Sequence, residues 1–234
     1  MGLNIVITGA SRGIGKATAE IFAAHGHHLF LTSLNELRLY KTMEELGTMY
    51  PSITIKAKAF DLAQKENVIA FGNWCLEQAI PDILINNAGA FEPGNVHNEP
   101  DGVLESQLSI NLLSAYYLTR TLSPKMIRRG SGHIFNICSI AALQAYENGG
   151  AYSISKFALN GFSKNLREEM KPLGIKVTAV HPGAVMTDSW ENFDNSSKRI
   201  MEADDIAKMV YAASQLSAGA CVEDIIIRPQ LGDL

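Results

Sequence analysis

The sequence predicts a single α/β domain with a doubly wound, parallel sheet of about seven strands flanked by helices. Apolar, β-rich segments alternate with amphipathic segments along the 234 residues. Several of the β-rich segments are nearly continuous apolar runs, as a sheet buried on both faces requires. No internal repeat, low-complexity tract or Pro/Gly/Ser-rich linker divides the chain, so we expect one domain over residues 1–234.

The individual elements follow from the same alternation. Short apolar runs rich in β-branched residues predict strands, in chain order, at 3–8, 28–32, 54–59, 83–86, 133–138, 176–181 and 224–228. Apolar residues spaced three and four apart predict helices between them at 14–25, 36–46, 65–79, 103–129, 152–173 and 203–215. Right-handed crossovers between parallel strands then place a ligand at the carboxyl ends of the strands.

Composition excludes several classes of protein. The net charge of −4 argues against a nucleic-acid partner, which requires a basic face. Three scattered cysteines are too few for a disulfide framework or a zinc site, so we expect inert thiols and no metal. The first strand begins almost at Met1 and no apolar run reaches spanning length, so we expect no signal peptide, no membrane segment and a cytoplasmic protein.

A glycine-rich turn stands at the first strand-to-helix junction. Gly9, Gly13 and Gly15 follow the apolar run 3–7 and precede a helical pattern. A nucleotide pyrophosphate binds at such a place because the backbone approaches it closely and the helix N-terminus offers unpaired N–H groups. The alternative is a tight turn without a ligand; the position directly after the first strand favours the phosphate cradle.

Tyr152 and Lys156 form the candidate catalytic pair. Residues four apart share one face of a helix, so the phenol and the ammonium reach one bound molecule. A free tyrosine has a pKa of about 10, and a nearby lysine cation is expected to lower it. In reduction the neutral phenol donates its proton to the forming alkoxide. The alternative for this pair is an exposed helix face.

Five further residues or motifs each have a structural alternative. Asp61 follows the third strand and also forms a plausible capping box with Gln64. Residues 86–89, Asn-Asn-Ala-Gly, and 182–187, which begin with Pro-Gly, are alternatively ordinary turns. Ser139 is alternatively a helix cap, and Asn111 a buried polar residue within a helix.

Taken together, these motifs resemble the short-chain dehydrogenase/reductase family, classical type. The resemblance covers residues 3 to about 228 and rests on T-G-x-x-x-G-x-G at 8–15, N-N-A-G at 86–89, Y-x-x-x-K at 152–156 and P-G-x-x-x-T at 182–187. It implies a Rossmann fold and reversible hydride transfer, without a metal, between a nicotinamide and a ketone or aldehyde and its secondary alcohol.

The resemblance also implies residue roles. Tyr152 is the acid/base, Ser139 holds the substrate carbonyl, Asn111 binds a water in a proton relay to Lys156, Asp61 meets the adenine, and Thr187 meets the nicotinamide carboxamide. The implied cofactor contacts are Gly9, Ser11, Arg12, Gly13, Ile14, Gly15, Ser33, Asp61, Leu62, Asn87, Ala88, Gly89, Tyr152, Lys156, Pro182, Gly183 and Thr187.

The residues after the second strand favour NADP over NAD, which stays possible. An NAD enzyme would carry an acidic residue near Ser33 to bind the ribose hydroxyls, and none is present. Arg12 suits a 2′-phosphate and Ser33 adds a hydroxyl. The second basic residue often found just after the strand is replaced by Leu34.

The expected pocket is lined by 90–95, 143–148 and 185–193, with a short lid over about 184–202. These segments suit a moderately hydrophobic carbonyl compound as the small-molecule substrate. Their large apolar and aromatic residues are Leu143, Tyr146, Met186, Trp190 and Phe193, and their acidic residues are Glu92, Glu147, Glu191 and Asp194.

Two alternatives stay open. A 3-oxoacyl-[acyl-carrier-protein] reductase needs a basic patch, for which Arg128, Arg129, Lys198 and Arg199 are candidates. A non-catalytic NAD(P)-binding sensor or scaffold would not need the serine, tyrosine and lysine together. By analogy with the family, we expect a homo-dimer or homo-tetramer assembled through the helices at 103–129 and 152–173.

Overall fold

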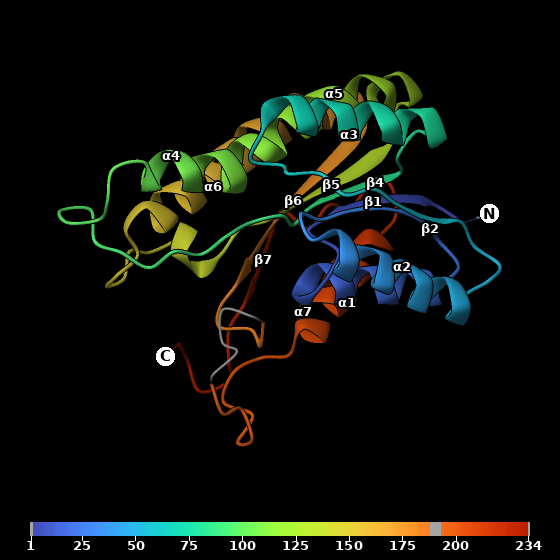
Figure 1. Ribbon diagram of the computed structural model, residues 1–234. Helices are drawn as coiled ribbons and strands as arrows, with labels where there is room; N and C mark the ends of the chain where they lie inside the picture. The colour runs from blue at the N-terminus through green and yellow to red at the C-terminus, as the bar shows by residue number, and fades with distance from the viewer. Residues whose placement is uncertain (1, 188–192, 234) are drawn as a thin grey trace.

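In the part of the chain that the structure describes, seven parallel strands form one sheet in the order β3-β2-β1-β4-β5-β6-β7 (Figure 1). The computed structural model describes residues 2–187 and 193–233. The strands are β1 (Asn4–Thr8), β2 (His28–Thr32), β3 (Ile55–Ala57), β4 (Ile83–Asn86), β5 (Gly132–Ile137), β6 (Ile175–Pro182) and β7 (Asp224–Ile227). The strand order reverses between β1 and β4. This switch point is where open parallel sheets bind ligands.

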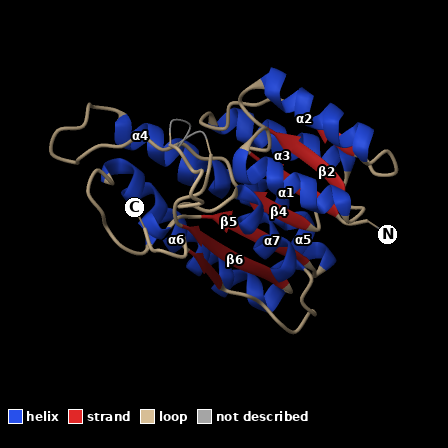
Figure 2. Ribbon diagram, turned by 90° about the horizontal axis from the view of Figure 1, so that it is seen from below, coloured by secondary structure: helices blue, strands red, loops and turns tan. Residues whose placement is uncertain are grey.

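Helices cover both faces of the sheet. On one face lie α1 (Gly13–Ala24), α2 (Glu36–Met49) and α7 (Ala203–Ser214); on the other lie α3 (Lys65–Gln78), α4 (Val103–Leu108), α5 (Ser114–Arg129) and α6 (Gly150–Met170). Figure 1 shows the strands running between these two layers, and Figure 2 shows the strands side by side across the sheet. The predicted doubly wound α/β fold is confirmed.

Each face of the sheet has its own hydrophobic core. Phe22 and Leu39 from the helices pack with Ile7 on the face of α1, α2 and α7. Phe71 and Leu118 belong to the core on the opposite face. Successive strand residues point to opposite faces, so the nearly continuous apolar runs supply both cores.

The helix expected over 103–129 is interrupted. α4 ends at Leu108, a π-helical turn occupies Ser109–Leu113, and α5 begins at Ser114. The spacing of apolar residues cannot reveal a π-helical turn, because the backbone stays helical and each hydrogen-bonded ring gains only one residue. Smaller differences occur at the expected strand 54–59, of which only Ile55–Ala57 pairs, and at α6, which begins at Gly150, two residues before Tyr152.

Candidate active site

The glycine turn after β1 leaves its backbone open to a ligand. Gly9 has φ +65°, which is left-handed backbone that favours glycine. A Cβ on Gly15 would lie 2.2 Å from the Gly9 carbonyl oxygen, so only glycine fits there. The turn ends at the N-terminus of α1, whose first N–H groups have no partner within the helix. This cradle fits a nucleotide pyrophosphate.

Asn87 holds the glycine turn from the neighbouring strand. Its Nδ2 donates to the carbonyl oxygens of Thr8 and Gly9, at 2.9 and 3.2 Å. The backbone N–H groups of Asn87 and Ala88 both donate to Thr8 Oγ1. The motif at 86–89 therefore fixes β4 to the turn, a structural role that the motif alone did not indicate.

Two serine hydroxyls meet beside the turn. Ser11 Oγ and Ser33 Oγ are 2.7 Å apart, and both residues are buried. Arg12 has extended backbone and precedes α1. Ser11, Arg12 and Ser33 come from the β1 turn and the end of β2, and the structure therefore brings these predicted NADP contacts to one corner of the molecule.

Asp61 does not cap α3. That helix begins at Lys65 after Gln64, and Gln64 makes no side-chain cap. Asp61 Oδ1 instead accepts the N–H of Ala63 at 3.0 Å, which closes a local turn. The capping-box alternative is therefore wrong. Leu62 points into the core beside α3 and is buried.

Ser139, Tyr152 and Lys156 converge at the carboxyl ends of β5 and β6. Ser139 follows β5, and its Oγ accepts the N–H of Ala141 at 3.1 Å, so it also caps the short 3₁₀ turn Ile140–Ala142. Tyr152 hydrogen-bonds with Ser139. Lys156 Nζ donates to the Ile137 carbonyl oxygen at 3.0 Å and lies 5.7 Å from the centre of the Tyr152 ring.

Burial moves both pKa values of the tyrosine–lysine pair. Burial raises the pKa of Tyr152 above 10, and the hydrogen bond with Ser139 opposes that rise. Burial lowers the pKa of Lys156 to about 8. The lowering of the tyrosine pKa expected from the neighbouring lysine is therefore not seen in the protein alone, because desolvation of the phenolate dominates.

Asn111 joins three elements behind the lysine. Its Oδ1 accepts the N–H of Ala90 at 2.9 Å, and its Nδ2 donates to Ala90 O, Gln107 Oε1 and Ser155 Oγ at 2.9–3.0 Å. It lies within the π-helical turn, which aims its side chain at the loop after β4. A Cβ on Gly89 would lie 2.8 Å from Asn111 Oδ1 and 3.5 Å from Lys156 Nζ.

Ser139, Tyr152 and Lys156 open onto one cavity of about 530 Å³. Nine predicted site residues line it, namely Ile14, Asn87, Gly89, Ser139, Tyr152, Lys156, Pro182, Gly183 and Thr187. The others named for the site do not line it, namely Gly9, Ser11, Arg12, Gly13, Gly15, Ser33, Asp61, Leu62, Ala88 and Asn111. A Cβ on Gly13 would lie 3.1 Å from Thr187 Cγ2, so the start of the expected lid lies against the glycine turn.

The expected pocket segments contribute in part. Phe91, Gln144, Tyr146 and Val185 line the cavity. Leu143 does not line the cavity and is exposed. Trp190 and Glu191, named for the pocket, and part of the expected lid lie outside the described residues. Asp233 also lines the cavity, and sequence reasoning missed it because nothing in the pattern after residue 228 links that segment to the site.

The basic residues named for an acyl-carrier partner are partly engaged within the fold. Arg129 pairs with Asp82 at 2.9 Å and donates to the Pro81 carbonyl oxygen. Arg199 donates to the carbonyl oxygens of Gly232 and Asp233. These contacts within the fold weaken the case for an acidic protein partner bound by Arg129 or Arg199.

The described part of the chain shows neither a membrane-spanning helix nor a cluster of metal ligands. Among residues 2–187 and 193–233, no helix has both the length and the apolar content that crossing a membrane needs. No group of three or more His, Cys, Asp and Glu side chains within those ranges is placed to hold a metal ion.

Comparison with known proteins places the site in a family. The short chain dehydrogenase family model matches residues 3–198. Sepiapterin reductase from Chlorobaculum tepidum is 33% identical over 98% of this chain and 97% of the relative. A metagenomic short-chain oxidoreductase in complex with NADP has a TM-score of 0.85 at 30% identity, covering 98% of this chain and 97% of that one.

L-sorbose reductase from Gluconobacter frateurii, complexed with NADPH and L-sorbose, has a TM-score of 0.88 at 27% identity and covers 97% of this chain and 95% of that one. These comparisons do not favour a 3-oxoacyl-[acyl-carrier-protein] reductase. Together with the matched turn and the serine, tyrosine and lysine at one cavity, they show that the chain belongs to the short-chain dehydrogenase family and is an enzyme of the dehydrogenase/reductase class, acting on CH–OH and C=O groups.

Proposed function

We propose that this enzyme is an NADP(H)-dependent reductase of ketones or aldehydes, with Tyr152 as the acid/base. The observation that carries the proposal is that Ser139, Tyr152 and Lys156 line the same cavity as Ile14 of the glycine turn and Thr187. A substrate carbonyl bound at the hydroxyls is therefore within reach of a cofactor bound at the turn.

The residues of the chain transfer the proton and orient the substrate. The nicotinamide cofactor, when bound, supplies the hydride chemistry. The Tyr152 hydroxyl donates its proton to the carbonyl oxygen during reduction, and the raised pKa of Tyr152 keeps it protonated for that purpose. Ser139 orients the same oxygen by hydrogen bonding. Near neutral pH Lys156, with a pKa of about 8, is mostly an ammonium and stabilises negative charge left on the phenol.

The preference for NADP rests on Ser11, Arg12 and Ser33, beside the glycine turn after β1. Ser33 stands where an acidic residue would repel a 2′-phosphate, and its hydroxyl contacts Ser11. Arg12 lies in the same turn and offers a fork of N–H donors. The two structures described above contain NADP and NADPH. We therefore expect NADPH to be used in preference to NADH.

Oxidation of NADPH and NADH tests the proposal. The panel contains simple ketones, aldehydes, diketones, a β-ketoacyl thioester, and sepiapterin and L-sorbose, the compounds after which two of the similar proteins are named. Turnover that Tyr152→Phe abolishes supports the assignment. A bound cofactor with no reduction of any carbonyl and no oxidation of the alcohols contradicts it and favours the sensor alternative.

Ser33→Asp tests the cofactor preference separately. A carboxylate at this position repels a 2′-phosphate and accepts hydrogen bonds from ribose hydroxyls, so the ratio of kcat/KM for NADPH to that for NADH should fall at least tenfold. Ser33→Ala is the matched control, because it removes the hydroxyl without adding charge. An unchanged ratio in Ser33→Asp would show that the 2′-phosphate binds elsewhere.

We also propose a homo-dimer or homo-tetramer. Ile154 and Phe157 on α6 are large apolar side chains left exposed, and Leu113 before α5 is exposed as well. Size-exclusion chromatography with light scattering that gives a 25.5 kDa particle would refute this assembly. The cytoplasmic location stays a prediction, which cell fractionation tests.

A further inference from the structure

We propose that His181 is a positioning residue of the active site: its ring holds the backbone carbonyl of Ser139 and so fixes the direction of the Ser139 hydroxyl. The proposal rests on the proposed function, in which that hydroxyl orients the substrate oxygen. His181 lies on β6, and its side chain is fully buried. It does not line the cavity, so it acts through Ser139 and not on the substrate itself.

The imidazole of His181 links β7 to the residue that follows β5. Its Nδ1 lies 3.2 Å from the Ser139 carbonyl oxygen, and its Nε2 lies 3.0 Å from Asp224 Oδ1 on β7. A carbonyl oxygen accepts hydrogen bonds and donates none, so the first contact requires a proton on Nδ1. At Nε2, a proton shared with the carboxylate satisfies the second contact. Asp224 therefore orients the ring so that Nδ1–H points at Ser139.

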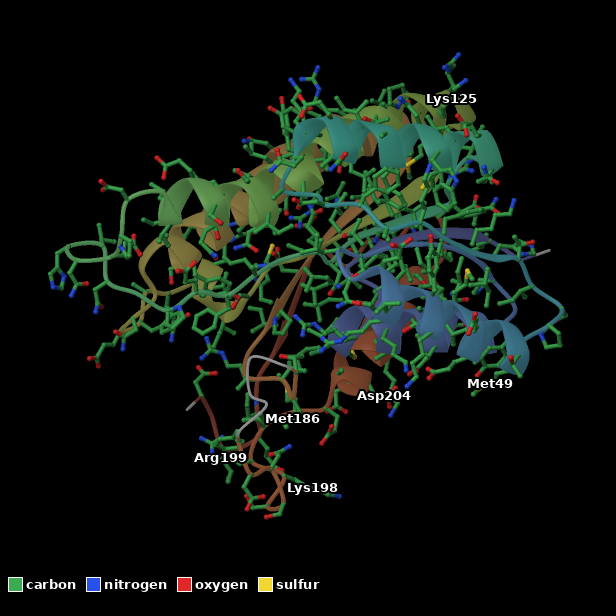
Figure 3. The ribbon with its side chains drawn as sticks, viewed as in Figure 1. Met49, Lys125, Met186, Lys198, Arg199 and Asp204 are labelled. Atoms are coloured by element: carbon green, nitrogen blue, oxygen red, sulfur yellow. The ribbon has the colours of Figure 1, made fainter. Side chains whose placement is uncertain are left out.

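Asp224 is itself held from α6. Its Oδ2 lies 3.6 Å from Arg167 Nη1, and Arg167 Nε donates to a backbone carbonyl oxygen of β6 at 3.1 Å. Arg167 Nη1 also lies 3.4 Å from Glu223 Oε2. Arg199, on the loop between β6 and α7, lies away from the sheet (Figure 3), so Arg167 is the arginine that reaches Asp224. The helix that carries the catalytic tyrosine thereby also fixes the carboxylate behind His181.

Ser139 needs this anchor because it lies just beyond the end of a strand. The ladder between β5 and β6 reaches Cys138, whose N–H donates to the Val180 carbonyl oxygen at 2.7 Å. The Ser139 carbonyl oxygen accepts the N–H of Ala142 at 2.9 Å, but that bond lies within the 3₁₀ turn and does not tie the turn to the sheet. The bond from His181 does. Because a small misplacement of a positioning group lowers the rate, this tie should affect turnover.

Two amide variants of His181 separate its two contacts. The amide nitrogen of asparagine is bonded to Cγ, as Nδ1 is, so His181→Asn keeps a donor for the Ser139 carbonyl. The amide nitrogen of glutamine lies one bond farther out, as Nε2 does, so His181→Gln keeps only the contact with Asp224. In NADPH-dependent ketone reduction, kcat should fall about tenfold or more in His181→Gln and much less in His181→Asn. NADPH affinity, measured by fluorescence titration, should stay unchanged in both.

His133→Gln is the matched control. His133 is a second buried histidine, at the amino end of β5 and away from the cavity, and its Nε2 lies 2.7 Å from Thr178 Oγ1. The control therefore makes the same substitution and also breaks a buried hydrogen bond, but it leaves Ser139 anchored. We expect it to lower stability without lowering kcat.

Ser139→Ala tests whether His181 acts through Ser139. If His181 aims the Ser139 hydroxyl, His181→Gln should lower kcat little further once that hydroxyl is absent. A purely structural role would lower kcat by the same factor whether residue 139 is serine or alanine.

Three kinetic outcomes would overturn the proposal. They are equal kcat in the two amide variants of His181, an equal loss in His133→Gln, and losses that multiply in the double variant with Ser139→Ala. Nitrogen NMR of the histidine-labelled, unmodified enzyme gives a readout that does not depend on activity: Nδ1 of His181 should carry a proton, and a bare Nδ1 overturns the proposal. If the variants fail to fold, this spectrum decides. If the unmodified enzyme reduces no ketone, the proposed function fails, and the spectrum decides the contact with Ser139 separately.

Discussion

Replacing Lys156 by methionine should stabilise the folded protein near neutral pH while it abolishes turnover. The side chain is nearly fully buried, with the residue 5% exposed, and burial lowers its pKa from 10.5 to about 8. At pH 7 the lysine is still mostly protonated in the folded state, so the fold bears the free energy of desolvating an ammonium. The lowering of the pKa corresponds to about 3 kcal/mol. Methionine has a similar length and no charge.

The pH dependence has a definite sign. Because the folded-state pKa lies below that of the unfolded chain, the unfolded chain binds more protons between about pH 8 and 10.5, and stability rises with pH through that window. The unfavourable contribution is fully present below pH 8. Lys156→Met removes it but leaves the Ile137 carbonyl without its 3.0 Å hydrogen bond, a loss of about 1 kcal/mol. The net gain at pH 7 should be about 2 kcal/mol.

Urea unfolding at several pH values between 7 and 10.5 measures this gain. Both proteins should carry Tyr152→Phe, because a tyrosine in the unfolded chain begins to titrate near pH 10 and the folded-state phenol lies against the lysine. The free-energy difference between them should shrink by about 3 kcal/mol over the range. A difference that is constant with pH, or a less stable methionine variant at pH 7, would refute the reasoning that a desolvated ammonium is held at this position.

Three further substitutions test other parts of the site and core. Gly15→Ala puts a methyl 2.2 Å from the Gly9 carbonyl oxygen, so NADPH affinity measured by fluorescence titration should fall at least tenfold; unchanged affinity would contradict the cradle. Asn111→Leu removes four hydrogen bonds and should lower the unfolding free energy by about 3 kcal/mol in urea; a loss below 1 kcal/mol would contradict this. Burial lowers the pKa of His133 to about 3, so the neutral imidazole contributes its full stability above pH 6.5, and that contribution is lost as pH falls toward 3. In His133→Gln the unfolding free energy should therefore vary less with pH between 3 and 6.5. A pH dependence parallel to that of the unmodified protein would contradict this.

The fold and the tyrosine–lysine pair could be predicted because both follow from residue patterns within short stretches of the sequence. Alternating periodicities gave the strands and helices, and the spacing of Tyr152 and Lys156 on one helix gave the pair. The π-helical turn at Asn111 could not be predicted, because it depends on hydrogen bonds to Ala90, twenty-one residues away. The local turn at Asp61 and the approach of Asp233 to the cavity likewise depend on contacts that spacing does not encode.

The buried polar groups behind Tyr152 are held by partners within the fold. Asn111 and Lys156 are buried and bond to carbonyls or side chains of the protein. A buried polar group that is hydrogen-bonded in this way is fixed in position, which suits chemistry that is the same for every substrate. Substitutions at Asn111 or Lys156 should therefore change how fast any ketone is reduced, and the rate should fall by a similar factor for each ketone in the panel.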